Sequence, residues 1–116
     1  MRLFKKRQAP RDSSGNADDD QTLAQVVQHG ADLAEPRHWV HYLYFNDEAG
    51  ARAAAETISA AGWELRRVGE SPVNDGTWSV VVEKNNVIVS PEAVHQARQF
   101  FEGLPGVDYD GWEVSL

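Results

Sequence analysis

The segment HWVHYLYFND, residues 38–47, gathers the side chains of this sequence that are best suited to chemistry: histidines, a tryptophan, tyrosines and a phenylalanine. Such a set can ligate a metal, stack nucleic-acid bases or form the middle of an ordinary sheet. Its β-branched and aromatic residues predict a strand over residues 38–45. Side chains of a strand alternate between faces, so His38 and His41 point apart and cannot chelate one metal together. Since His29 and His95 are isolated and no H-E-x-x-H spacing occurs, we predict no metal site.

The same alternation divides the aromatic residues of this strand between two faces. One face carries Trp39, His41, Leu43 and Phe45, which we expect to form the core beneath helices. Tyr42 and Tyr44 stand on the other face, where RNA-recognition domains of similar topology carry base-stacking aromatics. A neighbouring strand offers only Thr77, Ser79, Val81 and Glu83 on that face, and no aromatic RNA-binding run occurs. We therefore favour cross-strand packing or a protein contact for the two tyrosines.

Charge is distributed unevenly along the 116 residues. The first eleven residues carry +5 and no acid, whereas residues 12–116 hold eighteen acids against six bases, a net charge of −12. Such a body repels phosphate backbones, so direct nucleic-acid binding is disfavoured. The basic segment predicts a solvated arm, with docking on an anionic surface as the alternative. It has no apolar run for a secretory signal or a membrane span, so we expect a cytoplasmic protein.

Catalytic signatures are absent from the sequence. Without cysteine there is no thiol nucleophile and no cysteine-ligated metal, and no nucleophile elbow, P-loop or dinucleotide fingerprint occurs. Asp108 and Asp110 flank Tyr109 near a turn, where acids usually serve solvation. We predict no catalytic residue and no cofactor.

The order of predicted elements defines the fold class. We expect a flexible tail over residues 1–20, basic and then acidic, and one domain over residues 21–116. The domain opens with a short helix that Asp18, Asp19 and Asp20 cap and Gly30 ends. Strand, helix, strand, strand, helix and strand follow, the second of these helices starting at Ser90 and Pro91. This is the α+β, ferredoxin-like split βαβ pattern (βαββαβ), in which a four-stranded antiparallel sheet carries both helices on one face.

Several short segments carry a family resemblance when they are taken in order: GADLAEPRHWVHYLYF, a helix closing on AAGW, DGTWSVVVEK, a proline-initiated helix, and YDGWEV. Over roughly residues 22–114 the chain resembles the regulator of ribonuclease activity B family, also called ribonuclease E inhibitor proteins. The resemblance implies a non-enzymatic protein that binds an endoribonuclease of the ribonuclease E type, lowers its activity and so modulates RNA decay. An acidic body suits a basic surface on such an enzyme.

Aromatic residues are enriched in interface hot spots, which guides our choice of contact residues. We expect partner binding by Tyr42, Tyr44, Tyr109, Asp110, Trp112 and Glu113. Alternation with Val114 and Leu116 favours a core role for Trp112 instead, and Gly111 is typical of a bulge.

Two other functional classes stay open at this level. A cofactor-free enzyme or ligand-binding domain of the dimeric ferredoxin-like type predicts a deep apolar pocket with convergent polar groups. An interaction module with a partner unrelated to RNA predicts a flat apolar patch. A second copy of the chain pairing on the exposed face or edge, as a homodimer, is compatible with any of these classes.

Overall fold

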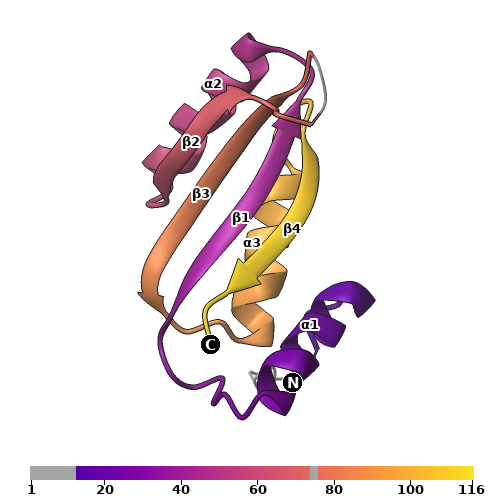
Figure 1. Ribbon diagram of the computed structural model, residues 1–116, viewed down its shortest axis with the longest axis vertical. Coiled ribbons are helices and arrows are strands. Elements are labelled where there is room, and N and C mark those ends of the chain that lie inside the picture. Colours follow the sequence, from indigo (N-terminus) through magenta and orange to yellow (C-terminus); the bar gives the residue numbers. More distant parts are fainter. Residues whose placement is uncertain (1–12, 74–75) are drawn as a thin grey trace, which may run out of the picture.

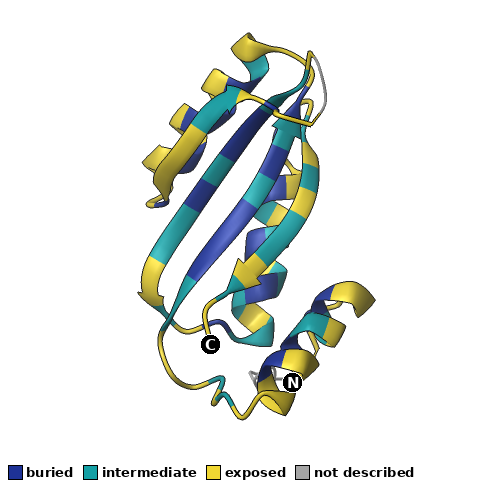
Figure 2. Ribbon diagram, viewed as in Figure 1, coloured by how far each residue is buried: buried dark blue, intermediate teal, exposed yellow. Residues whose placement is uncertain are grey.

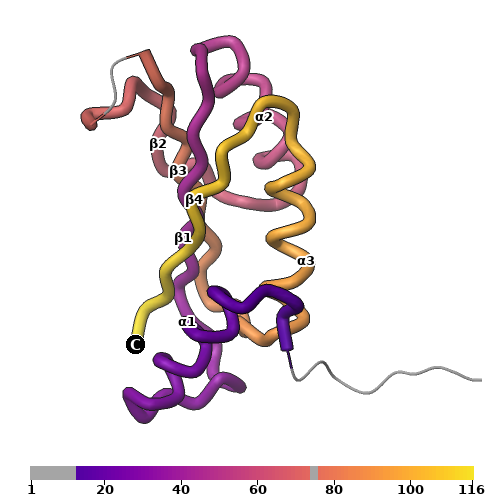
Figure 3. The backbone as a smooth tube through the Cα atoms, turned by 90° about the vertical axis from the view of Figure 1, so that its right-hand side faces the viewer, coloured from indigo at the N-terminus to yellow at the C-terminus, as the bar shows by residue number. Residues whose placement is uncertain are grey.

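The computed structural model describes residues 13–73 and 76–116, and the basic segment of residues 1–11 lies outside them. Its elements are α1 (Ala17–Gln28), β1 (Arg37–Phe45), α2 (Glu48–Ala60), β2 (Glu64–Glu70), β3 (Trp78–Val87), α3 (Pro91–Glu102) and β4 (Asp108–Val114). The four strands form one antiparallel sheet in the order β2-β3-β1-β4 (Figure 1). Seen along the sheet, α2 and α3 both lie on one side of it (Figure 3). The predicted α+β, ferredoxin-like fold is confirmed.

The two helices that cover the sheet begin where the sequence indicates. Asp47 is the N-cap of α2 and accepts a hydrogen bond from the Gly50 amide. Ser90 is the N-cap of α3 and accepts one from the Ala93 amide, with Pro91 in the first turn. These caps satisfy amide groups that have no partner inside the helix, and they fix where each helix starts above the sheet.

α1 begins earlier than expected. Asn16, not an aspartate, is its N-cap, and the helix starts at Ala17 with the three aspartates in its first turn. Residues 17–20, which the sequence predicts to be part of a flexible tail, thus belong to α1. The hydroxyl of Ser14, a residue only 2% exposed, donates to Asp20 Oδ1 at 2.7 Å. Negative charge near a helix N-terminus is favourable, which explains why the acidic run is helical.

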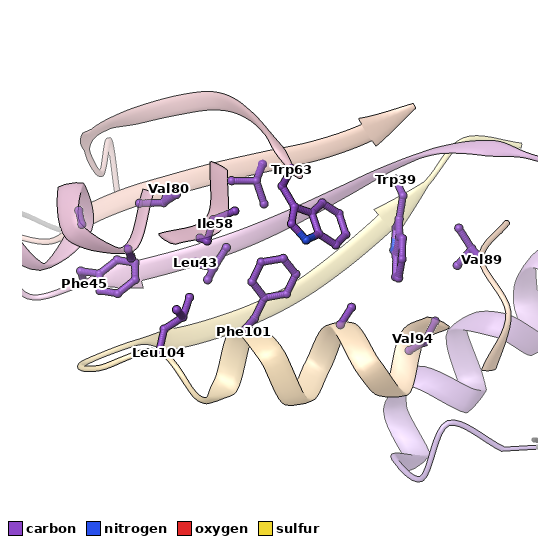
Figure 4. Close-up of a cluster of buried hydrophobic side chains, with 14 of the residues drawn as sticks. Trp39, Leu43, Phe45, Ile58, Trp63, Val80, Val89, Val94, Phe101 and Leu104 are labelled. Atoms are coloured by element: carbon purple, nitrogen blue, oxygen red, sulfur yellow. The ribbon is translucent and has the colours of Figure 1, made fainter. Parts of the chain in front are cut away.

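The core lies between the sheet and the two covering helices (Figures 2 and 4). From β1, Leu43 and Phe45 are buried as predicted, and Ile58 of α2 and Phe101 of α3 pack against them. Alanines on the inner face of α2 let that helix lie close to the sheet. None of the described helices covers the opposite sheet face, which faces the viewer in Figure 1; we call it the open face.

Candidate partner-binding surface

The alternation predicted for β1 is seen in the burial of its side chains from His41 to Phe45, whereas Val40 on the open face is also buried. His41 is fully buried beneath the helices, while His38 lies on the open face, its Nε2 2.7 Å from Glu83 Oε1. Among the described residues, no cluster of three or more histidine, aspartate or glutamate side chains is arranged to hold a metal ion.

Tyr42 and Tyr44 both stand on the open face and are partly exposed. The Tyr42 hydroxyl donates a hydrogen bond to Glu113 on β4. This bond, helped by partial burial, raises the pKa of Tyr42, so the phenol is protonated at neutral pH. Tyr44 pairs with Ser79 on one side and Asp108 on the other. The two rings therefore stand beside the acidic strand β4.

Basic groups of the open face bond to acceptors of the protein itself. Arg67 on β2 donates from Nε to Ser79 Oγ at 3.1 Å and from Nη2 to the Glu70 carbonyl at 2.7 Å. Arg66 Nη1 lies 3.9 Å from Glu83 Oε1. These contacts reduce the capacity of the two arginines to bind phosphates, in line with the small basic share of the sequence.

Acidic groups of the other edge, by contrast, form no ion pairs with described residues. Asp108, Asp110 and Glu113 of β4 are exposed, and none of them forms an ion pair with another described residue. We call these three carboxylates, together with Tyr42 and Tyr44, the acidic tyrosine surface. It presents aromatic area beside unpaired negative charge.

A β-bulge in β4 separates the expected contact residues. The register between β1 and β4 shifts between Tyr42, which faces Gly111, and Leu43, which faces Tyr109. Gly111 has φ +110°, a conformation that L side chains rarely adopt, so the expected bulge is confirmed at this glycine. Because of the extra residue, Tyr109 and Trp112, although three apart, both pack against the core on the helix side. The structure thus places Tyr42, Tyr44, Asp110 and Glu113 at the surface and sets Tyr109 and Trp112 apart from them.

Trp112 takes part in a buried polar network that the sequence did not indicate. Its Nε1 donates to Asp19 Oδ1 at 2.9 Å, and Arg98 donates to both oxygens of the same carboxylate at 2.6 and 2.8 Å. Asp19 is only 4% exposed, and its hydrogen bonds raise the pKa of Arg98. The network fastens α1 to α3 and β4. No sequence signal links Asp19 and Arg98, which are 79 residues apart and lie in different elements.

His41 belongs to the same buried region. Its ring centroid lies 4.5 Å from that of Trp39, 4.8 Å from that of Trp63 and 4.6 Å from that of Phe101, and its Nδ1 shares a 2.7 Å hydrogen bond with the Tyr109 hydroxyl. Burial lowers the pKa of His41 to about 3. The imidazole is therefore neutral at physiological pH and enclosed by aromatic rings, which makes it a core residue and not a solvent-facing base.

Together the ferredoxin-like fold, the polar core network and the acidic tyrosine surface define a small α+β protein whose exposed features suit contact with another macromolecule. The family model described as regulator of ribonuclease activity B matches residues 16–114. The chain belongs to this family, whose members regulate ribonuclease activity. Comparison with curated proteins gives no match. No helix in the described part of the chain has the length and hydrophobicity needed to cross a membrane.

Proposed function

We propose that this protein is a non-enzymatic inhibitor, acting in the cytoplasm without a cofactor, that binds an endoribonuclease of the ribonuclease E type through its acidic tyrosine surface. Family membership supports a ribonuclease as the target. The observation that carries the proposal is the set of unpaired carboxylates on β4 beside two partly exposed tyrosines. A ribonuclease must attract RNA with basic groups, and a surface of opposite charge meets such groups favourably.

The two kinds of residue contribute differently to this contact. The carboxylates of Asp108, Asp110 and Glu113 accelerate association and orient the partner, an effect that salt screens. The rings of Tyr42 and Tyr44 supply buried contact area once the complex has formed. Charge changes therefore act on the association rate at low salt, and ring removal acts on dissociation.

Titration of the protein into a purified ribonuclease E-type enzyme tests the proposal, with binding and cleavage of a model RNA followed together. Saturable binding with falling cleavage is expected. Binding without loss of cleavage would identify an adaptor and overturn inhibition, and no binding at low salt would overturn the proposed partner.

A matched pair of variants tests the role of β4 charge. Asp108→Asn with Asp110→Asn should slow association about 2- to 10-fold at low salt, and the difference should shrink as salt rises. Glu56→Gln with Glu64→Gln changes the net charge equally at exposed positions on α2 and β2 and should have a smaller effect. Equal slowing by both pairs would mean that net charge, and not this surface, attracts the partner.

Truncation of Tyr44 tests the aromatic part of the surface. Tyr44→Ala should weaken binding about 5-fold or more, as expected when a contact residue of an interface is removed, with the melting temperature unchanged. Unchanged affinity, or a loss that follows a fall in melting temperature, would assign the ring to packing.

A further inference from the structure

The helix side of the molecule carries a groove that the proposed function does not use. It lies between α3 and the C-terminal end of α2 and has a volume of about 670 Å³. The rings of Trp39 on β1 and of Trp63, just before β2, line one wall, and Ala93 and Phe100 line it from α3. Figure 4 shows both indoles on the side of the sheet that faces α3. Ile88, 51% exposed, adds an apolar side chain to its wall.

The ammonium group of Lys84 lies beside this apolar groove. Lys84, which also lines it, holds its Nζ 4.3 Å from the centroid of the Trp63 ring. Among the described residues Lys84 has no acidic partner within ion-pair distance, although the body around it is strongly acidic. An ammonium group next to apolar surface favours a ligand that carries a carboxylate.

An unsatisfied donor lies in the same wall. The indole Nε1 of Trp39 is buried and has no hydrogen-bond partner among the residues that the structure describes, and Trp39 as a whole is 4% exposed. A buried donor without an acceptor is unfavourable, so a ligand oxygen that accepts from Trp39 Nε1 would supply a hydrogen bond that the free protein lacks.

We propose that the groove binds a segment of another protein that inserts an apolar side chain against Trp39 and Trp63 and places a carboxylate beside Lys84. The groove is open to solvent rather than enclosed, so it lacks the walls that bury most of a small metabolite's surface, whereas a peptide can enter from the side. The carboxylate complements Lys84, the one cation among the described residues that line the groove. The site is on the opposite side of the sheet from the acidic tyrosine surface, so it goes beyond the proposed function.

Indole N–H signals of the ¹⁵N-labelled full chain provide the test, with the Trp39 signal assigned through Trp39→Phe. The probes are N-acetyl-Leu-Phe with a free carboxylate and the same dipeptide as its C-terminal amide. We expect the carboxylate form to move the Trp39 and Trp63 signals saturably and to bind about 5-fold more tightly than the amide, a ratio near 1 kcal/mol. No movement, or equal binding of the two forms, would overturn the proposal.

Two charge-removing variants make the test specific. Lys84→Met keeps the apolar stem and should reduce affinity for the carboxylate form to that for the amide. Arg67→Met removes a cation of the open face that also forms no ion pair with a described residue, and should leave affinity unchanged. An equal loss of affinity in both variants would mean that the probe is attracted by the net charge of the protein and not by the groove.

A groove-filling variant and a small ligand complete the design. Ala93→Leu should abolish binding while thermal unfolding shows that the fold is retained; binding that persists in the folded variant would place the probe elsewhere. 4-Phenylbutyrate should bind more weakly than the dipeptide carboxylate. If it binds as tightly, the groove is a site for small apolar carboxylates and the proposed protein segment is wrong. None of these measurements uses a ribonuclease, so they stand or fall independently of the proposed function.

Discussion

Protonation of His41 should make the stability of this protein depend on pH. The side chain is fully buried, and burial is the main reason why its pKa falls from 6.5 to about 3, with the positive charges of Arg98 and Lys84 adding to the effect. Its hydrogen-bond partner, the phenol of Tyr109, has a pKa raised by burial and stays neutral. The folded protein thus holds a neutral imidazole under conditions in which the unfolded chain takes up a proton.

The sign and size of the effect follow from proton linkage. Below pH 6.5 the unfolded state binds one more proton than the folded state, so the free energy of unfolding falls as pH falls, until the folded form also protonates near pH 3. The slope approaches about 1.4 kcal/mol per pH unit. Between pH 7.5 and pH 5.0 the loss from this one residue is about 2 kcal/mol.

Urea unfolding at these two pH values measures the loss. His41→Leu replaces the imidazole with an apolar side chain of similar size and should remove about 2 kcal/mol of the pH dependence, whatever its effect on stability at pH 7.5. Tyr109→Phe, the matched control, removes the hydrogen bond but keeps the imidazole and should retain the slope. The reasoning would be refuted if the free energy of unfolding had the same pH dependence in the wild-type and His41→Leu proteins. An NMR titration midpoint above pH 5 for His41 would refute it as well.

Two further predictions concern the attachment of α1 and the bulge of β4. Asp19→Ala removes the bidentate partner of Arg98 and the acceptor of Trp112, and it leaves Arg98 only its ion pair with Glu102, so it should lower the free energy of unfolding by about 1–3 kcal/mol in urea unfolding. Asp18→Ala, one residue earlier and exposed, should change it by less than about 0.5 kcal/mol, and similar losses for the two variants would contradict the network. Gly111→Ala should lower the free energy of unfolding by about 1–3 kcal/mol. The cause is the φ of +110° at residue 111 and not a clash, because a Cβ there meets no atom within 4 Å. An unchanged melting curve would argue against the bulge.

Local signals in the sequence were enough for most of the scaffold. The alternation along β1 assigned His41, Leu43 and Phe45 to the core, because the two-residue period of a strand is fixed by backbone geometry. Ser90 and Pro91 located the start of α3 because an N-cap acts on amides within the next turn. Strand alternation and helix capping depend on residues that are close together in the chain, so both can be predicted from a single sequence.

Errors arose where a residue's role depends on a distant partner. The acidic run before residue 21 looked like a solvated tail, since nothing nearby in the chain reveals that Asp19 meets Arg98. Tyr109 and Trp112 were expected among the contact residues, with alternation favouring a core role for Trp112; both rings pack against the core because the bulge adds a residue between them. The presence of a bulge could be expected from Gly111, but its effect on which face each neighbour occupies could not.

The sequence by itself determined the order of elements, the alternating faces of β1, the caps of the covering helices and the excess of acidic charge, all of which follow from short-range backbone preferences and composition. Only the tertiary structure decided that Asp19 is the carboxylate buried against an arginine, while the carboxylates of β4 form no ion pairs with described residues. It also decided that Lys84 lies beside an apolar groove with no acidic partner among the described residues. The reason is physical. Pairing and burial are properties of distances between segments remote in the chain, and these distances exist only once the sheet and helices have packed.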